Sequence, residues 1–243
     1  SLQTDDKYYT YKFIDKNCTT ISIDKVNSVL SSSKIESTKP ITKTYREVLF
    51  TYQKNHFFLN LGINLIFGTK VDELAKTLFL PLDLIASLEQ NEAVAEPKTT
   101  LYKAPENTFI PSVFDSIFTL VVVLGIIVLS QKKWLTYSYF LLLGIVGLFF
   151  CLVGLYSLHQ EVLWNYNAFL INPFYLILFY FLIKKNAKGI RVTAKLLFVF
   201  HLVYLVYMVN KIHLKIVVPF FVANLLLLFQ ILRQKTEFVI RNS

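Results

Sequence analysis

Five long apolar runs fill the second half of the chain, and short polar connections separate them. About 20 apolar residues are needed to cross a hydrocarbon core about 30 Å thick. Flanking Trp164, Tyr166 and Arg233 can extend the two shorter runs to the membrane surface. The runs cover approximately residues 113–130, 135–158, 168–183, 192–209 and 217–232. This pattern predicts an α-helical membrane bundle of five transmembrane helices over residues 113–243.

The first half has a mixed pattern, in which short periodic segments alternate with polar stretches. The apolar spacing predicts a strand at residues 8–14 and helices at residues 18–30, 42–55 and 71–90. Pro81 should break or kink the last of these helices, because proline lacks a backbone N–H. We therefore expect a water-exposed domain over residues 1–90, joined to the membrane domain by a polar linker over residues 91–112.

The charges are divided unevenly between the two halves. Residues 1–112 hold 13 basic and 13 acidic residues, whereas residues 113–243 hold 12 basic and 3 acidic ones. Cytoplasmic connections of membrane proteins are enriched in Lys and Arg, which predicts that residues 1–112 face outward and the C-terminus is cytoplasmic. The cations on the predicted cytoplasmic side are Lys132, Lys133, Lys184, Lys185, Lys188, Arg191, Arg233, Lys235 and Arg241. Because they lie between apolar runs, we expect no nucleic-acid partner.

The two cysteines lie in different environments, Cys18 in the polar half and Cys151 within an apolar run. Their separation excludes the short Cα distance that a disulfide requires. Cys18 falls where the predicted strand gives way to a helix, with Asn17 as a candidate N-cap and with Tyr11 and Asp15 nearby. A helix N-terminus stabilises a thiolate, which makes Cys18 a candidate nucleophile. The alternative is a small buried cysteine with a structural role.

A cysteine nucleophile needs a base, and four histidines are available. His56 lies in the polar half, where we expect a surface position. His159 and His213 lie in the two predicted outward connections. His201 lies within an apolar run, and we expect it to face the bundle interior because ionisable groups avoid lipid.

The outward connection between the second and third runs is rich in polar residues. One interpretation is a turn with an aromatic anchor at the membrane surface. The other is a polar lip that binds a lipid headgroup or an incoming substrate, formed by His159, Glu161, Trp164, Asn165, Asn167 and Asn172. We expect no metal ion and no cofactor.

The segment YTYKFIDKNCTT (9–20) resembles the cysteine segment of the lipoprotein N-acyltransferases called Lnb. The segments at 55–68, 79–84 and the outward connection around Glu161 are also similar to that family. The resemblance covers most of the chain, and its strongest motif is the Asn17-Cys18 pair. More remotely, this pair resembles the circularly permuted papain-like domains of the NlpC-like and LRAT-like type, which implies part of an α+β extracytoplasmic domain.

The resemblance implies an enzyme that needs no cofactor. Cys18 would take an acyl chain from a membrane phospholipid as a thioester and pass it to the α-amino group of a diacylglyceryl-cysteine lipoprotein. Asn17, Asp15 and Tyr11 would support Cys18. The protein would lie in a bacterial inner membrane, with its N-terminal segment in the periplasm and its C-terminus in the cytoplasm.

One departure from that family concerns the histidine, which in the resembling proteins lies upstream of the cysteine. The chain begins in a polar run without a signal peptide, SLQTDDKYY. We therefore expect the chain to be a fragment, a split subunit or a cleavage product, with the histidine in a separate or cleaved N-terminal half. On its own the chain should be inactive. Two other functions stay open: a membrane-bound cysteine hydrolase or amidase of cell-envelope lipids or peptides, and a non-catalytic membrane assembly module.

Overall fold

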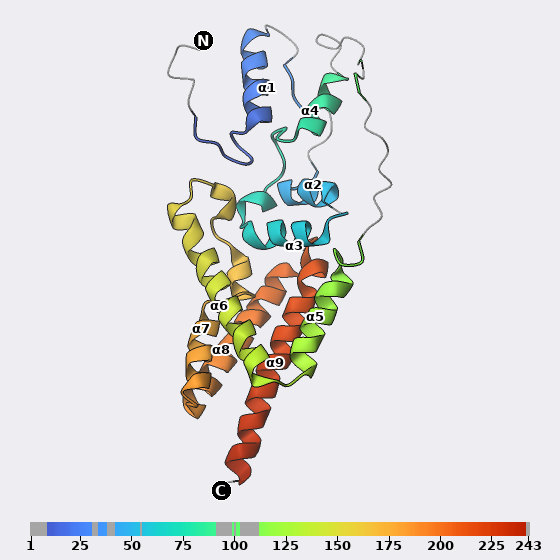
Figure 1. Cartoon of the computed structure of the whole chain (residues 1–243). Helices are drawn as coiled ribbons and strands as arrows, with labels where there is room; N and C mark the ends of the chain where they lie inside the picture. Colours follow the sequence, from blue (N-terminus) through green and yellow to red (C-terminus); the bar gives the residue numbers. More distant parts are fainter. Residues whose placement is uncertain are drawn as a thin grey trace.

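A computed structural model of the chain describes residues 9–30, 34–37, 42–53, 55–90, 99, 101–102 and 112–241, with side chains described as far as 233. Helices dominate these residues, and the described ranges contain no β-strand. Figure 1 shows a long helical bundle, with two short helices lying across one end and two more helices beyond them. We call the helical part before residue 91 the cap.

The bundle has a helix at each of the five predicted apolar runs. Three of them are long and apolar enough to cross a membrane: α6, α8 and the part of α9 over Leu214–Arg233. Gln160–Phe169 and Phe174–Ile183, bent by 42° at a short break, together make a fourth candidate span. The bundle helices are α5 (Ile117–Leu129), α6 (Lys133–Tyr156), η3 (Gln160–Val162), η4 (Tyr166–Phe169), α7 (Phe174–Ile183), α8 (Ala187–Met208) and α9 (Leu214–Arg241).

Helix α5 is shorter than the other candidate spans. Its 13 residues rise only about 20 Å, because an α-helix rises about 1.5 Å per residue. Ser116 caps it by accepting a hydrogen bond from the Thr119 N–H. The described residues therefore include three or four helices of membrane-spanning length, and α5 packs beside α9 as a shorter apolar helix.

Small residues bring α6 and α7 close together. A side chain at Gly144 would overlap Leu176, and one at Gly147 would meet the backbone around Ile171. Small residues at helix contacts allow this backbone approach inside membranes, where no hydrophobic force drives helices together.

The outward faces of the bundle are apolar. Such a continuous apolar surface is unusual for a water-soluble protein and is typical of contact with lipid. The exposed residues include Val121, Val122, Ile126, Leu142, Ile145, Leu152, Val199, Val206, Val222, Leu226 and Phe229.

The cap has its own small core, formed by Ile14, Tyr45, Leu49, Val71 and Phe79. Its helices are short, and side chains cap the first two of them, at Asn17 and Thr44. They are α1 (Cys18–Val29), α2 (Tyr45–Tyr52), α3 (Phe57–Ile66), η2 (Lys70–Asp72) and α4 (Pro81–Leu88).

Two expectations for the cap need correction. The single helix expected over 71–90 is instead η2, an irregular stretch and α4, which begins at Pro81. Proline suits the first helical position, where its missing N–H would have no partner in the helix.

The strand expected over 8–14 is also absent from its described part, residues 9–14. A tight turn closed by one bridge between Lys12 and Lys16 takes its place, and the permuted papain-like β part is not seen in the described residues. Most of the expected linker over 91–112 lies outside them.

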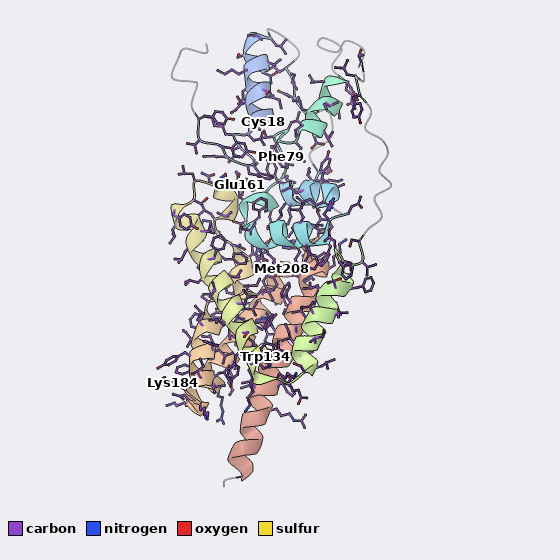
Figure 2. The ribbon with its side chains drawn as sticks, in the orientation of Figure 1. Cys18, Phe79, Trp134, Glu161, Lys184 and Met208 are labelled. Carbon is purple, nitrogen blue, oxygen red and sulfur yellow. The ribbon has the colours of Figure 1, made fainter. Side chains whose placement is uncertain are left out.

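The described cations of the predicted cytoplasmic side gather at the bundle end far from the cap. Lys132 and Lys133 lie between α5 and α6, and Lys184 and Lys185 lie between α7 and α8. Figure 2 shows Lys184 at this far end, with Cys18 and Glu161 on the cap side. The two ends of the bundle therefore differ in charge.

Candidate functional site

Cys18 is the first residue of α1, and it is exposed and unpaired. Asn17 caps the helix as the sequence predicts: its side chain accepts a hydrogen bond from the Thr20 N–H at 3.0 Å. The Asn17 N–H in turn donates to the Thr20 hydroxyl at 2.9 Å, which completes a capping box. The local sequence thus fixes where α1 begins and holds Cys18 in its first turn.

Asn17 also ties the start of α1 to the cap core. It is 4% exposed, and its side-chain amide donates to the carbonyls of Phe13 at 2.7 Å and Phe79 at 2.9 Å. Phe79 belongs to the buried cluster of the cap. The position of Cys18 is therefore set by the same residue that caps its helix.

Glu161 fastens the turn before Cys18 to the bundle. Its side chain comes from η3 and is 0% exposed. One carboxylate oxygen accepts a hydrogen bond from the Ile14 N–H at 2.8 Å. Backbone hydrogen bonds between Lys12 and Lys16 close the turn around Ile14. The segment before Cys18 therefore contacts the connection between α6 and α7 that the sequence singled out. Figure 2 shows Cys18 and Glu161 toward the same end of the molecule.

His159 stands beside this contact. Its Nδ1 lies 3.7 Å from the second oxygen of Glu161, and its ring meets the edge of Tyr11 at a centroid distance of 6.3 Å. Asp15, which the sequence placed beside the cysteine, is exposed and lies 3.7 Å from the Lys70 ammonium. The structure thus brings His159 and Glu161 against the segment before Cys18, with contacts at Tyr11 and Ile14.

The remaining predicted residues of the outward connection have different surroundings. Asn165 donates to the carbonyls of Leu65 and Ile66, and Asn167 donates to those of Asn64 and Leu65. These carbonyls end α3 and have no partner within that helix, so the two asparagines dock α3 on the bundle.

Asn172 and Trp164 flank that docking contact. The Asn172 side chain accepts a hydrogen bond from the Phe174 N–H at 2.9 Å, at the start of α7. Trp164 is 82% exposed and has a left-handed backbone with a φ of 51°. Its side chain is available to the surroundings, whereas Asn172 has a local structural contact.

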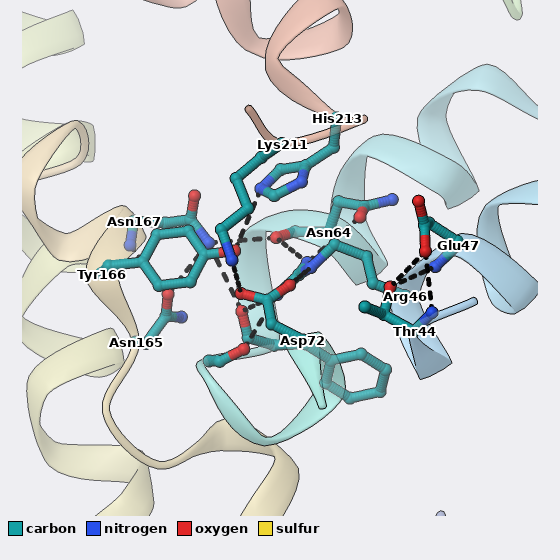
Figure 3. Close-up of polar contacts among 12 residues, drawn as sticks. Thr44, Arg46, Glu47, Asn64, Asp72, Asn165, Tyr166, Asn167, Lys211 and His213 are labelled. Carbon is teal, nitrogen blue, oxygen red and sulfur yellow. Dashed lines mark hydrogen bonds and ion pairs between the residues drawn. The ribbon is translucent and has the colours of Figure 1, made fainter. Parts of the chain in front are cut away.

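A buried ion-pair cluster at the cap–bundle interface was missed by the sequence reasoning. Arg46 from α2 donates to Asp72 at 2.6 Å, and Lys211 from the α8–α9 connection reaches the other oxygen of Asp72 at 2.9 Å. Tyr166 lies beneath both cations, with its ring centroid 5.6 Å from the Arg46 guanidinium carbon and 5.9 Å from the Lys211 ammonium. Figure 3 shows this cluster between the cap and the bundle.

Arg46 has further partners at the end of α3. Its guanidinium donates to the carbonyls of Asn64, Phe67 and Gly68. Arg46 is 2% exposed, and all these acceptors lie close to one another in the chain. The buried cation is therefore fully hydrogen-bonded, as a stable buried charge requires.

The cluster perturbs the protonation of its members. Burial alone would raise the pKa of Asp72, but the charge of Arg46 and the hydrogen bonds from Lys211 and Arg46 outweigh burial and hold that pKa below its usual value. Burial, with the nearby charges of Arg46 and Lys211, lowers the pKa of His213 to about 3. His213 is therefore neutral at physiological pH.

The cap also contains a cavity. A cavity of about 430 Å³ opens between α2 and α4, and Lys43, Tyr52, Phe79 and Asp83 are among its lining residues. Within the described ranges, no three His, Cys, Asp or Glu side chains lie close enough to hold a metal ion.

No family model matches the chain, and neither a curated protein nor a solved structure has detectable similarity to it. The fold and the site therefore define the class: a mostly helical protein with membrane-length apolar helices and a small cap that carries an exposed cysteine. The likeness to the Lnb acyltransferases stays a prediction.

Proposed function

We propose that this protein is a lipoprotein N-acyltransferase that uses Cys18 as its nucleophile. Cys18 takes an acyl chain from a membrane phospholipid and passes it to the α-amino group of a diacylglyceryl-cysteine lipoprotein. The observation that carries the proposal is the exposed thiol of Cys18 in the capped first turn of α1, seated through Glu161 on the end of an apolar bundle. The sequence resemblance supplies the substrates.

The proposed location follows from charge. The cations at the far end of the bundle favour the cytoplasm for that end, and we infer that the cap lies on the opposite side of the membrane. The resemblance implies that this membrane is a bacterial inner membrane. In this arrangement α5 and the bent segment that ends in α7 complete five crossings. Both substrates are lipid-anchored, so a nucleophile just above the outer leaflet meets them without extracting either from the membrane.

The proposed reaction has two steps. The Cys18 thiolate attacks the ester carbonyl of the donor, a C–S bond forms, and the C–O bond breaks to release a lysophospholipid, whose alkoxide takes up a proton. The acceptor amine then attacks the thioester, a C–N bond forms, the C–S bond breaks, and the amine proton leaves. Backbone N–H groups in the first turn of α1 are available to stabilise the developing oxyanion.

A labelled donor tests the first step. Membranes containing the protein, with the upstream histidine segment that the resemblance implies, are incubated with a phospholipid that carries an alkyne-tagged acyl chain. We expect a tag on Cys18 that neutral hydroxylamine removes and that Cys18→Ala lacks, with Cys151→Ser as the matched control. A tag that persists in Cys18→Ala would contradict the proposal.

The hydrolase alternative differs in the second step. A hydrolase would lose the tag to water at the same rate with or without an amine acceptor. A transferase loses it rapidly only when a diacylated lipopeptide is added, and the tag appears on that peptide.

A further inference from the structure

We propose that His159 accepts the proton of the acceptor amine during transfer, and that Glu161 positions His159 for this role. The inference rests on the proposed function of Cys18 and assigns the second step to residues of the membrane half. His159 and Glu161 lie more than 140 residues after Cys18, yet they adjoin its segment.

The first observation is the state of Glu161. Its side chain is 0% exposed, and one oxygen is satisfied by the Ile14 N–H. Among the described residues, the other oxygen has no hydrogen-bond partner and lies 3.7 Å from Nδ1 of His159. A buried carboxylate with an unsatisfied oxygen is costly unless a cation faces it. Protonation of His159 supplies that cation.

The second observation is that His159 is accessible. Its side chain is 44% exposed, so its ring can reach a substrate while Glu161 stays behind it. A histidine with one nitrogen near a carboxylate and the ring open to the substrate side is a general base with an orienting group. Glu161 itself is too buried to touch an acceptor.

The third observation relates His159 to the cysteine segment. Lys12 and Lys16 pair through two backbone hydrogen bonds of 3.0 and 3.3 Å, which close the turn that carries Ile14 and leads into Asn17. Tyr11 meets the His159 ring, and Asn17 precedes Cys18. His159 and Glu161 therefore contact the turn that leads into Cys18, at Tyr11 and Ile14.

The proton balance of the second step is then complete. The amine nitrogen forms its bond to the thioester carbon and gives one proton to His159. The C–S bond breaks, and the Cys18 thiolate leaves. The imidazolium, stabilised by the Glu161 carboxylate, returns the proton to the thiolate or to water.

The test separates the two steps. With the tagged donor, we expect His159→Gln to form the Cys18 thioester but to transfer it about 100-fold more slowly, because general-base catalysis typically contributes 10²–10⁴-fold. Glu161→Gln keeps an acceptor for the Ile14 N–H and should slow transfer about 10-fold. The matched control is His56→Gln, which removes an exposed histidine near Asp115 and should transfer at the wild-type rate.

Chemical rescue distinguishes a base from a structural residue. Added imidazole should restore transfer in His159→Ala, since the small base can occupy the vacated space. Transfer at the wild-type rate in His159→Gln would overturn the inference and leave Cys18 as the nucleophile. Loss of the thioester in His159→Gln would also overturn it, because the residue would then act in the first step. If wild-type protein forms no thioester, the proposed function fails as well.

Discussion

Asp72 joins the cap to the bundle, because it pairs with Arg46 of the cap and with Lys211 of the bundle. The guanidinium is 3% exposed and meets one carboxylate oxygen, while Lys211 from the far part of the chain meets the other. This cluster lies on the cap–bundle interface, as does the contact between Ile14 and Glu161. Stability and the placement of Cys18 should therefore depend on separate residues of the same interface.

Removing the charge of Asp72 should destabilise the protein strongly. Asp72→Asn leaves the buried Arg46 charge without its counter-ion, and breaking a buried pair costs about 3–5 kcal/mol. Thermal unfolding in detergent, compared with that of the exposed-site control Lys76→Ala, measures the loss. An unfolding midpoint equal to that of the control would show that the ion pairs of Asp72 contribute nothing to the stability of the folded protein.

The same residue predicts a pH dependence. The folded-state pKa of Asp72 is lowered, so its contribution to stability is present above the ordinary carboxyl pKa and is lost as pH falls through the lowered value. Below about pH 4 the carboxyl of the unfolded wild-type protein becomes protonated. Once pH has fallen through the lowered folded-state pKa, the folded carboxyl is protonated too and resembles the asparagine of Asp72→Asn. The difference in unfolding midpoint between the two proteins should therefore shrink toward low pH. A difference that grows on acidification contradicts the assignment.

At the scale of elements, specific contacts hold short segments at the start of α1 and at the end of α3. Asn17 joins α1 to the cap core, and the end of α3 is held by side chains from the outward connection. Gly68 follows α3 and donates its N–H to the Glu161 carbonyl at 2.7 Å. Substitutions at Asn17 and Gly68 should therefore disturb α1 and the end of α3, respectively.

Replacing Asn17 should loosen α1. Asn17→Ala loses the cap, worth about 1 kcal/mol, and also the bonds to Phe13 and Phe79. Asn17→Ser keeps a capping oxygen and should recover part of the loss. Hydrogen exchange of the α1 amides measures this order, with exchange fastest in Asn17→Ala. Equal exchange in all three proteins would contradict the capping role.

A side chain at Gly68 should separate the cap from the outward connection. A Cβ there would overlap the carbonyl of Leu163, which belongs to the backbone and cannot move aside cheaply. Gly62 has no neighbour within 4 Å and lies inside α3, where alanine is favoured by about 1 kcal/mol. We expect Gly68→Ala to lower the unfolding midpoint and Gly62→Ala to preserve or raise it. The reverse order would refute the close approach.

The sequence predicted local elements better than their pairing. Asn17 indicated the start of α1 because a capping side chain binds a backbone N–H only three residues away. The apolar runs indicated the bundle helices because the length of one apolar segment is enough to predict a helix in lipid. Arg46, Asp72 and Lys211 could not be grouped, because 26 and 139 residues separate the paired members. Pro81 was understood as a break, although the structure uses it to begin α4.

At the scale of the whole molecule, the cap and the basic end lie at opposite ends of an apolar bundle (Figures 1 and 2). Charge asymmetry of this kind predicts orientation. The account therefore requires Cys18 outside the cytoplasm and the α7–α8 connection inside it.

Thiol labelling in intact cells tests this orientation. In a Cys151→Ser background, a membrane-impermeant maleimide should label Cys18 before lysis. In a Cys18→Ser, Cys151→Ser background, a cysteine introduced by Lys188→Cys should react only after lysis. If the introduced cysteine were labelled in intact cells and Cys18 only after lysis, the orientation of the protein in the membrane would be the opposite of the one proposed.

Mass spectrometry of lipoprotein N-termini, taken from cells that depend on this protein for acylation, tests the proposed N-acyltransferase activity most directly. We expect triacylated N-termini with the wild-type protein and diacylated N-termini with Cys18→Ala at equal protein abundance. Triacylated N-termini that persist with Cys18→Ala would contradict this proposal.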